Sequence, residues 1–367
     1  MGSLTLLALA AACTRGPEPL PSPPPGPLDV DDRFLERIRS PDFTGTYVVE
    51  GTFVLGPRSE RPLQLEQAGE GTFRGLDSKE RVTFRGPGRE ITLEGLTVGG
   101  VHYLRTEDGP WVRQPSSDLS SLFRDLDTLD DYGPQVVEGR RVRVLRPPPF
   151  FRILPEHLGL DDPAVRELRS ASVDLYAAED GTPVGFAVAA TWVQLVACAQ
   201  VEVEVSSRYW LRPGPLAQAI APPSDPWELH LSPELGYRMG HPPGWSVTGE
   251  EGRDVFRGPL GAVVVVRAPR VAGSVTLEDL VRAQREADGR LQGSEAIELD
   301  GEPARLLTFH VTRDRSPALL QLAVALHPQP VQGTRRVYVL AWASPAGAEE
   351  ADRARFREFL STFEFGC

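Results

Sequence analysis

Apolar and polar residues alternate along much of residues 43–210, which is the periodicity of β-strands with one buried face. In residues 46–55 one face of the predicted strand carries the apolar side chains Tyr47, Val49, Phe53 and Leu55. Residues 199–210 alternate valine with glutamate before an aromatic pair. Short turns that contain glycine and proline separate these runs. The spacing predicts an antiparallel sheet with one apolar and one solvated face.

Three segments break this alternation. Residues 31–40 have helical periodicity, and residues 147–160 form a short apolar segment that begins with three prolines. Residues 117–129 predict a helix for which Ser117 or Asp118 can serve as N-cap. Its apolar stripe comprises Leu119, Leu122, Phe123, Leu126 and Leu129. Together these elements predict a strongly curved sheet with helices over its concave face.

Residues 212–226 are rich in proline and lack periodicity, so we expect them to link two domains. The chain after them predicts a second β-rich region, with central strands at residues 262–269 and 336–344 and a hairpin turn at residues 314–317. Thr276 is the expected N-cap of one helix. A second helix begins near residue 348, and its expected docking side chains are Ala354, Phe356, Phe359 and Leu360.

The first residues of the chain do not match a folded domain. The apolar run at residues 4–12 would reach only about 14 Å as a helix, whereas a bilayer core is ~30 Å thick. That length indicates a signal peptide over residues 1–12. Three alanines precede Cys13, and the pattern resembles the lipobox of bacterial lipoproteins, in which this cysteine carries diacylglycerol. The alternative is an ordinary cleaved signal with a chance cysteine.

Residues 13–30 are expected to form a tether. Seven prolines lie within residues 17–27, and proline fixes φ and removes N–H donors. An extended polyproline conformation over residues 14–30 would span up to about 50 Å. Such a spacer would hold the folded part away from a membrane surface, facing the extracytoplasmic side; the alternative is a disordered remnant of processing.

Charge and cysteine content narrow the choice of partners and of compartment. The formal net charge is −12, which argues against a nucleic-acid partner because such a partner requires a basic face. Cys198 and Cys367 remain besides Cys13, and disulfides persist in exported proteins. These two residues could therefore pair; a buried thiol at Cys198 and a free one at Cys367 are the alternative.

Motifs that carry catalytic chemistry are absent from the sequence. No histidine pair has the spacing of a metalloprotease, and the chain has no CxxC, no Gly-x-Ser-x-Gly elbow and no phosphate-binding loop. We therefore expect no enzyme activity, no cofactor and no metal. A serine triad assembled from distant positions stays open as a weaker hypothesis.

Residues 31–212 resemble the LolA-like and LppX/LprG-like envelope lipoproteins. The resemblance depends on the order of strands and on phrases such as Val-Asp-Leu-Tyr with Asp-Gly-Thr-Pro-Val at residues 173–184, and Tyr-Leu-Arg with Gly-Pro-Trp at residues 103–111. It implies an unclosed β-barrel around a hydrophobic cavity that holds acyl chains. It transfers no catalytic residue.

Residues 227–367 resemble the PsbP-like or Mog-type sandwich. The matching features are Tyr237, the Pro-Pro-Gly-Trp sequence at 242–245, the Leu-Asp-Gly-Glu-Pro-Ala turn at 299–304 and the aromatic helix at 356–363. This resemblance implies an α/β/α sandwich with an antiparallel sheet. Such a fold serves mostly as a binding or assembly module.

The sequence thus predicts an α+β lipoprotein that binds a hydrophobic, acyl-chain ligand and acts as a carrier, chaperone or sensor. The alternative is an assembly or signalling module that binds a protein partner through its C-terminal domain, without lipid cargo. In the carrier hypothesis the short segment after residue 147 lines or covers the cavity mouth, and its candidate ligand-binding residues are Phe150, Phe151, Ile153 and Leu154. The competing interpretation is that Phe150 and Leu154 fill the concave face as ordinary core.

Overall fold

The computed structural model describes residues 30–366, apart from nine short segments. These are residues 57–58, 60–61, 107–108, 115–118, 161–163, 197–198, 288–289, 314–315 and 346–348. The expected signal peptide and the tether up to residue 29 lie outside the described residues, as do all three cysteines. The lipidation of Cys13 and the pairing of Cys198 with Cys367 therefore stay predictions.

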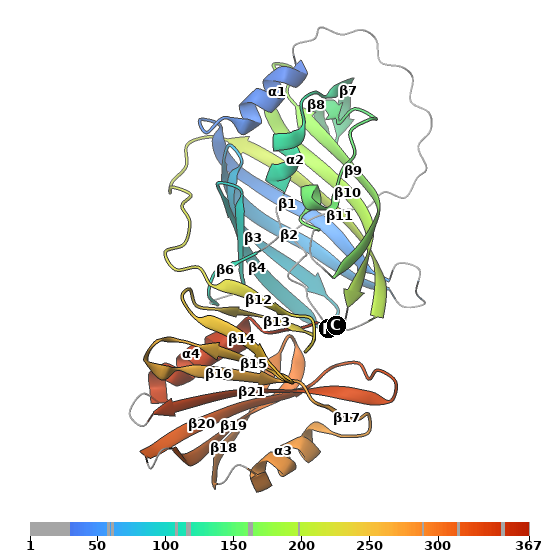
Figure 1. The fold of residues 1–367 in the computed structure, drawn as a ribbon. Helices are drawn as coiled ribbons and strands as arrows, with labels where there is room; N and C mark the ends of the chain where they lie inside the picture. The colour runs from blue at the N-terminus through green and yellow to red at the C-terminus, as the bar shows by residue number, and fades with distance from the viewer. Residues whose placement is uncertain are drawn as a thin grey trace.

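The first sheet has eleven antiparallel strands in the order β6-β5-β4-β3-β2-β1-β11-β10-β9-β8-β7 (Figure 1). Its strands are β1 (Thr44–Leu55), β2 (Leu63–Arg74), β3 (Asp77–Gly86), β4 (Arg89–Val98), β5 (Val101–Thr106), β6 (Val112–Arg113), β7 (Asp130–Val137), β8 (Arg140–Arg146), β9 (Val165–Ala177), β10 (Pro183–Val196) and β11 (Ala199–Pro213). The edge strands β6 and β7 are not paired with each other, so the sheet is an arc and not a closed barrel.

Glycines on the concave face allow the central strands of this arc to lie close together. Gly51 of β1 pairs with Gln67 of β2 on one side and with Ser207 of β11 on the other. A Cβ at Gly51 would collide with the backbone oxygen of Ser206. Only glycine therefore fits this position without a shift of the backbone.

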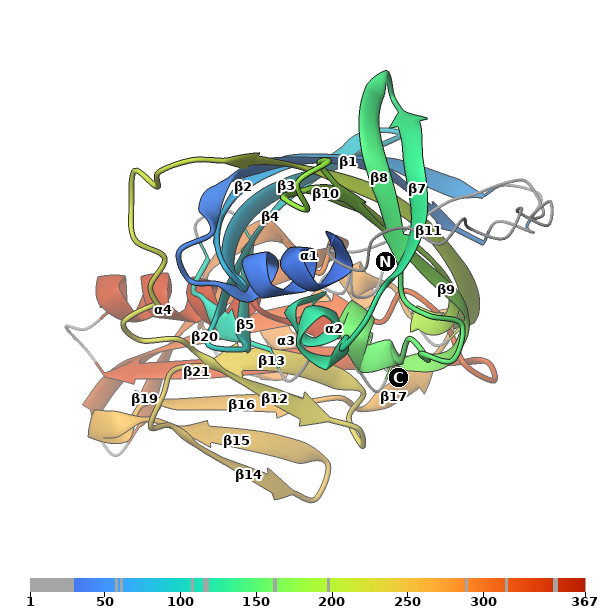
Figure 2. The same cartoon turned by 90° about the horizontal axis from the view of Figure 1, so that it is seen from above.

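Two helices and one 3-10 helix cover the concave face: α1 (Val30–Arg39), α2 (Leu119–Asp125) and η1 (Pro155–Leu158). Viewed from above, α1 and α2 lie within the opening of the arc (Figure 2). All five residues of the stripe predicted for residues 117–129 are buried in the core, although Leu126 and Leu129 follow the end of α2. The predicted caps Ser117 and Asp118 lie outside the described residues.

Two further sheets follow β11. A three-stranded sheet comprises β12 (Glu228–Ser232), β13 (Tyr237–His241) and β22 (Glu364–Phe365). An eight-stranded antiparallel sheet comprises β14 (Ser246–Glu250), β15 (Arg253–Arg257), β16 (Val263–Arg267), β17 (Arg270–Ala272), β18 (Arg290–Leu299), β19 (Glu302–Arg313), β20 (Ser316–Leu326) and β21 (Thr334–Pro345). The helices of this part are η2 (Pro259–Gly261), α3 (Leu277–Ala287) and α4 (Glu349–Ser361).

Helices α3 and α4 pack on opposite faces of the eight-stranded sheet. Val281 of α3 lies in one apolar cluster with Leu307, whereas Phe356 of α4 lies in another with Leu306. Neighbouring residues of a strand point to opposite faces, so the two helices are on different sides. Three of the four predicted docking residues of α4 are buried, but Ala354 is exposed, so its expected role in docking is wrong.

The predicted N-cap of α3 is confirmed. The backbone N–H of Asp279 donates to Oγ1 of Thr276 at 3.2 Å, and the N–H of Thr276 donates back to the Asp279 carboxylate at 3.1 Å. This reciprocal pair satisfies donors that the first turn of a helix leaves free.

The proline-rich segment after β11 packs onto the first sheet. Ile220 is buried beside Leu96 of β4 and Tyr103 of β5. Val112 of β6 forms a parallel bridge with Trp227, and both side chains are buried in the cluster that contains α4. The first sheet and the later sheets are therefore joined by packed side chains as well as by the chain. The α+β class and the large antiparallel, unclosed sheets agree with the prediction.

Candidate functional site

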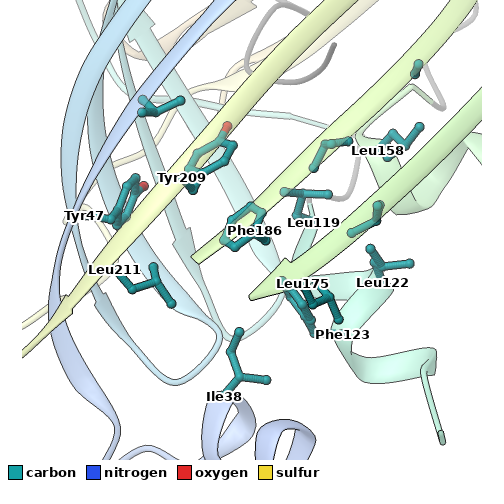
Figure 3. Close-up of a cluster of buried hydrophobic side chains, with 14 of the residues drawn as sticks. Ile38, Tyr47, Leu119, Leu122, Phe123, Leu158, Leu175, Phe186, Tyr209 and Leu211 are labelled. Carbon is teal, nitrogen blue, oxygen red and sulfur yellow. The ribbon is translucent and has the colours of Figure 1, made fainter. Parts of the chain in front are cut away.

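The concave face of the first sheet carries the candidate site. Its side chains form a continuous apolar cluster with α1, α2 and η1. Phe186 of β10 lies 4.4 Å from Tyr209 of β11, centroid to centroid, and 5.6 Å from Phe123 of α2. Figure 3 shows these rings pointing toward one another from the sheet and from α2. The helix therefore covers this part of the concave face.

One end of the concave face is sealed by α1. Phe34, Leu35 and Ile38 of α1 are buried there, together with Phe43 and Phe73. The Arg39 guanidinium donates hydrogen bonds to the carbonyl oxygens of Phe123, at 2.7 Å, and of Leu126. These bonds satisfy carbonyls that the C-terminal end of α2 leaves free, and they fix α1 to α2.

The opposite end has half-buried apolar side chains. At this end one row of paired residues crosses five neighbouring strands. In strand order from β2 to β9 its members are Leu63, Leu55, Val203, Trp192 and Leu168. Three half-buried apolar residues of this row, Leu55, Leu63 and Leu168, define the rim together with half-buried Ile91 of β4, which pairs with Phe84 close to the turn between β3 and β4. Apolar side chains thus continue from the buried cluster to the surface at this end.

The structure separates the four ligand-binding residues predicted from sequence. Phe151 and Ile153 pack, half-buried, against the apolar cluster. Phe150 is 85% exposed, so it does not fill the concave face as core, and its predicted role in ligand binding stays a prediction. Leu154 is half-buried directly before η1.

Sequence reasoning missed the residue that holds this segment in place, which is His157 of η1. His157 is buried, and its ring stacks on Phe151 with centroids 5.5 Å apart. Nδ1 accepts the backbone N–H of Leu154 at 3.1 Å, and Nε2 donates to the Asp125 carboxylate at 3.0 Å. The imidazole therefore positions Phe151 and η1 against the end of α2.

Polar side chains interrupt the apolar concave face at two places. Oε1 of Gln67 accepts a hydrogen bond from the hydroxyl of Ser207, and both side chains are buried. The phenol of Tyr47 donates to the Glu80 carboxylate at 3.0 Å. The sequence contained a signal for Gln67, because it occupies an inward position of a strand between Leu65 and Phe73.

The convex face has a separate hollow of about 340 Å³ beneath the β7–β8 hairpin. The Trp210 ring lies on its wall, 5.4 Å from Tyr176 and 4.3 Å from the guanidinium carbon of Arg140. Glu138 at the hairpin tip accepts the indole N–H of Trp210 at 3.0 Å and pairs with Arg208. These contacts fix the hairpin onto the convex face.

A buried polar group lies in the C-terminal part. The Tyr237 phenol donates to Asp254 at 2.7 Å, and Nε2 of His230 lies 3.2 Å from the same oxygen. Burial, and then the hydrogen bond to Asp254, raise the pKa of Tyr237 well above its usual value. The phenol therefore stays protonated and serves as a structural donor.

The part of the chain that the structure describes contains no cluster of three or more His, Cys, Asp or Glu side chains suited to a metal ion. Among the described residues, no helix combines the length and hydropathy needed to cross a bilayer.

Comparisons with known proteins found no matching family model and no matching curated protein. Similar solved structures include LpqN of Mycobacterium tuberculosis, which is involved in cell envelope biogenesis (TM-score 0.30, 12% identity, 40% of this chain and 87% of LpqN). LprF of Mycobacterium bovis matches with a TM-score of 0.23 and 12% identity, over 53% of this chain and 99% of LprF.

MucB, solved in complex with MucA(peri), matches over 92% of this chain and 98% of its own, with a TM-score of 0.23 and 16% identity. With TM-scores of 0.30 and below, these similarities do not define the function of the chain.

Proposed function

We propose that the chain is a non-enzymatic envelope lipoprotein that binds an acyl chain on the concave face of the first sheet. The observation that carries this proposal is the difference between the two ends of that face. Apolar side chains are buried beneath α1 at one end, whereas they are half-buried at the rim formed by Leu55, Leu63, Ile91 and Leu168. A flexible alkyl chain can enter where the apolar surface reaches solvent.

The chemistry of this face suits an acyl chain. Transfer of a methylene from water into an apolar site is favourable by about 0.8 kcal/mol, so an alkyl chain can bind without charged contacts. Phe151 and Ile153 extend the apolar surface, and the contacts of His157 hold them in place. We assign these two residues to the entry side of the site.

The N-terminal segment supplies the location in this proposal. A lipid on Cys13 would anchor the protein to the cell membrane, and residues 14–30 would extend the folded part up to about 50 Å into the extracytoplasmic space. Residues 31–212 are the ligand-binding domain, residues 213–226 the connection, and the PsbP-like residues 227–367 the surface for a protein partner.

The test is native mass spectrometry of protein purified without detergent. We expect a mass increase that matches an acyl lipid bound noncovalently. The variant Leu63→Glu should lose this adduct because it places a charge on the rim. Gln64→Glu is the matched control, since it adds the same charge one residue along β2 at an exposed position. A bare mass in every preparation would contradict the carrier role and would favour the assembly or signalling role.

The anchor has its own test. Cys13→Ser should release the protein from the membrane fraction and abolish incorporation of labelled fatty acid. If the wild type incorporates no label and the variant stays with the membrane, the lipid anchor is wrong.

A further inference from the structure

Gln67 is a buried amide on an otherwise apolar part of the concave face. Its side chain is 3% exposed, and that of Ser207 is 2% exposed. The two residues lie on opposite sides of Gly51, whose missing side chain lets them reach each other across β1. Their hydrogen bond uses the amide oxygen of Gln67, and the NH₂ group of the same amide takes no part in it.

That NH₂ group has no acceptor among the described residues. Nε2 of Gln67 is fully buried and makes no hydrogen bond to the part of the protein that the structure describes. A buried amide donor without an acceptor is unfavourable, and such groups are uncommon in folded proteins. We therefore expect the acceptor of Nε2 of Gln67 to come from outside the sheet.

The neighbouring rows of the sheet show which kind of acceptor fits. On one side the row contains Val49, Gly69 and Tyr209, and on the other it contains Phe53, Leu65 and Val205. Neither set includes a charged residue. A carboxylate at this position would be a buried charge whose only partner is a neutral donor, and its desolvation is unfavourable. An ester or amide carbonyl accepts the same hydrogen bond and carries no charge.

We propose that Nε2 of Gln67 donates a hydrogen bond to the carbonyl oxygen of an ester-linked acyl chain on the concave face. The site then selects acyl esters, such as lipid acyl groups, over free fatty acid anions. This inference rests on the proposed function, because it requires that the concave face holds an acyl chain.

The experiment compares three probes of equal chain length: methyl myristate, tetradecane and myristate. Each is delivered from cyclodextrin to the full chain, and affinity is measured by native mass spectrometry. The variant Gln67→Met removes the donor and keeps a side chain of similar length. Gln194→Met is the matched control, because Gln194 is equally buried and its oxygen accepts the indole N–H of Trp192 at 3.1 Å.

In the wild type we expect methyl myristate to bind more tightly than myristate. Gln67→Met should weaken methyl myristate about tenfold, equivalent to ~1.4 kcal/mol, and leave tetradecane unchanged. Gln194→Met should change the affinities for methyl myristate and tetradecane by the same factor. In addition, the ¹³C signal of the carbonyl-labelled ester bound to the wild type should lie downfield of the same signal in Gln67→Met, because the variant lacks the hydrogen-bond donor.

The outcomes separate the two proposals. If methyl myristate and tetradecane both bind but Gln67→Met weakens them equally or not at all, the role of Gln67 is wrong and the carrier role stands. Tighter binding of myristate than of its ester, or the same carbonyl signal for ester bound to the wild type and to Gln67→Met, also overturns the assignment. If none of the probes binds the wild type, the proposed function itself fails.

Discussion

Nε2 of His157 lies 3.0 Å from Oδ2 of Asp125, and this contact joins two segments that are 32 residues apart in the chain. The same ring accepts the N–H of Leu154 through Nδ1 and stacks on Phe151. One buried imidazole thus fixes the end of α2, the start of η1 and an apolar residue of the proposed entry.

Replacement of His157 tests this role. We expect His157→Ala to lower the free energy of unfolding by about 2–4 kcal/mol, because it removes two hydrogen bonds and a buried ring. Amide hydrogen exchange of residues 154–160 should accelerate more than exchange in β1. Asp125→Asn keeps an acceptor oxygen and should cost less than about 1 kcal/mol. Equal protection of residues 154–160 in His157→Ala and the wild type would contradict this role.

Gly51 should be far more sensitive to substitution than a strand glycine that has open space around it. Gly51→Ala should destabilise by about 3 kcal/mol or more, because the added methyl would collide with the backbone of Ser206 between β1 and β11. Gly293→Ala in β18 is the control, since a Cβ there meets nothing within 4 Å. Chemical denaturation measures both variants, and similar stabilities would refute the close approach of these strands.

The Tyr237 phenol should contribute to stability through its bond to Asp254. Tyr237→Phe keeps the ring stack on Phe363, at 5.5 Å, and removes only the hydroxyl. Asp254 is buried and loses one of its donors, so we expect a loss of about 1–3 kcal/mol in thermal or chemical unfolding. A stability equal to that of the wild type would show that the hydroxyl is dispensable.

Buried histidines should make stability depend on pH. Burial lowers the pKa of His327, whose Nδ1 accepts the N–H of Gln329 at 3.1 Å and whose Nε2 lies 3.2 Å from the carbonyl oxygen of Gly366. The folded state therefore binds this proton less readily than the unfolded state, where the pKa is about 6.5. The stabilisation is complete above that value and is lost as pH falls toward the lowered folded pKa.

Unfolding by denaturant between pH 8 and pH 5 measures this effect. The free energy of unfolding should fall as the pH decreases below about 6.5, and His327→Gln should flatten the curve. His241 is a second contributor, because burial lowers its pKa as well. An unchanged slope in His327→Gln would refute the contribution of this histidine.

The periodicity of the sequence was sufficient to predict strands and helices, because each element buries one face. Tyr47, Val49 and Phe53 lie on the buried face of β1 as their alternation indicates. Ala354 was misassigned because a small apolar residue satisfies a helical stripe at little cost when it is exposed. The bounds of α2 were harder to predict, since Leu126 and Leu129 remain buried beyond its end.

The candidate site was less accessible to sequence reasoning than the fold. Hydrophobicity alone grouped Phe150 with Phe151, although the backbone turns one outward and the other onto the cluster. The pairs Gln67–Ser207 and His157–Asp125 depend on register and on loop geometry, which periodicity does not specify. A glutamine at an inward strand position was nevertheless visible in the sequence.

Photochemical labelling tests the binding of an acyl chain most directly. A methyl ester with a diazirine near the end of its alkyl chain would be irradiated with the full protein, and the labelled residues would be mapped by mass spectrometry. We predict labels on inward residues of β2, β9 and β10, and their loss in Leu63→Glu but not in Gln64→Glu. Labels confined to the convex face, or no specific label at all, would contradict the binding of an acyl chain inside the arc.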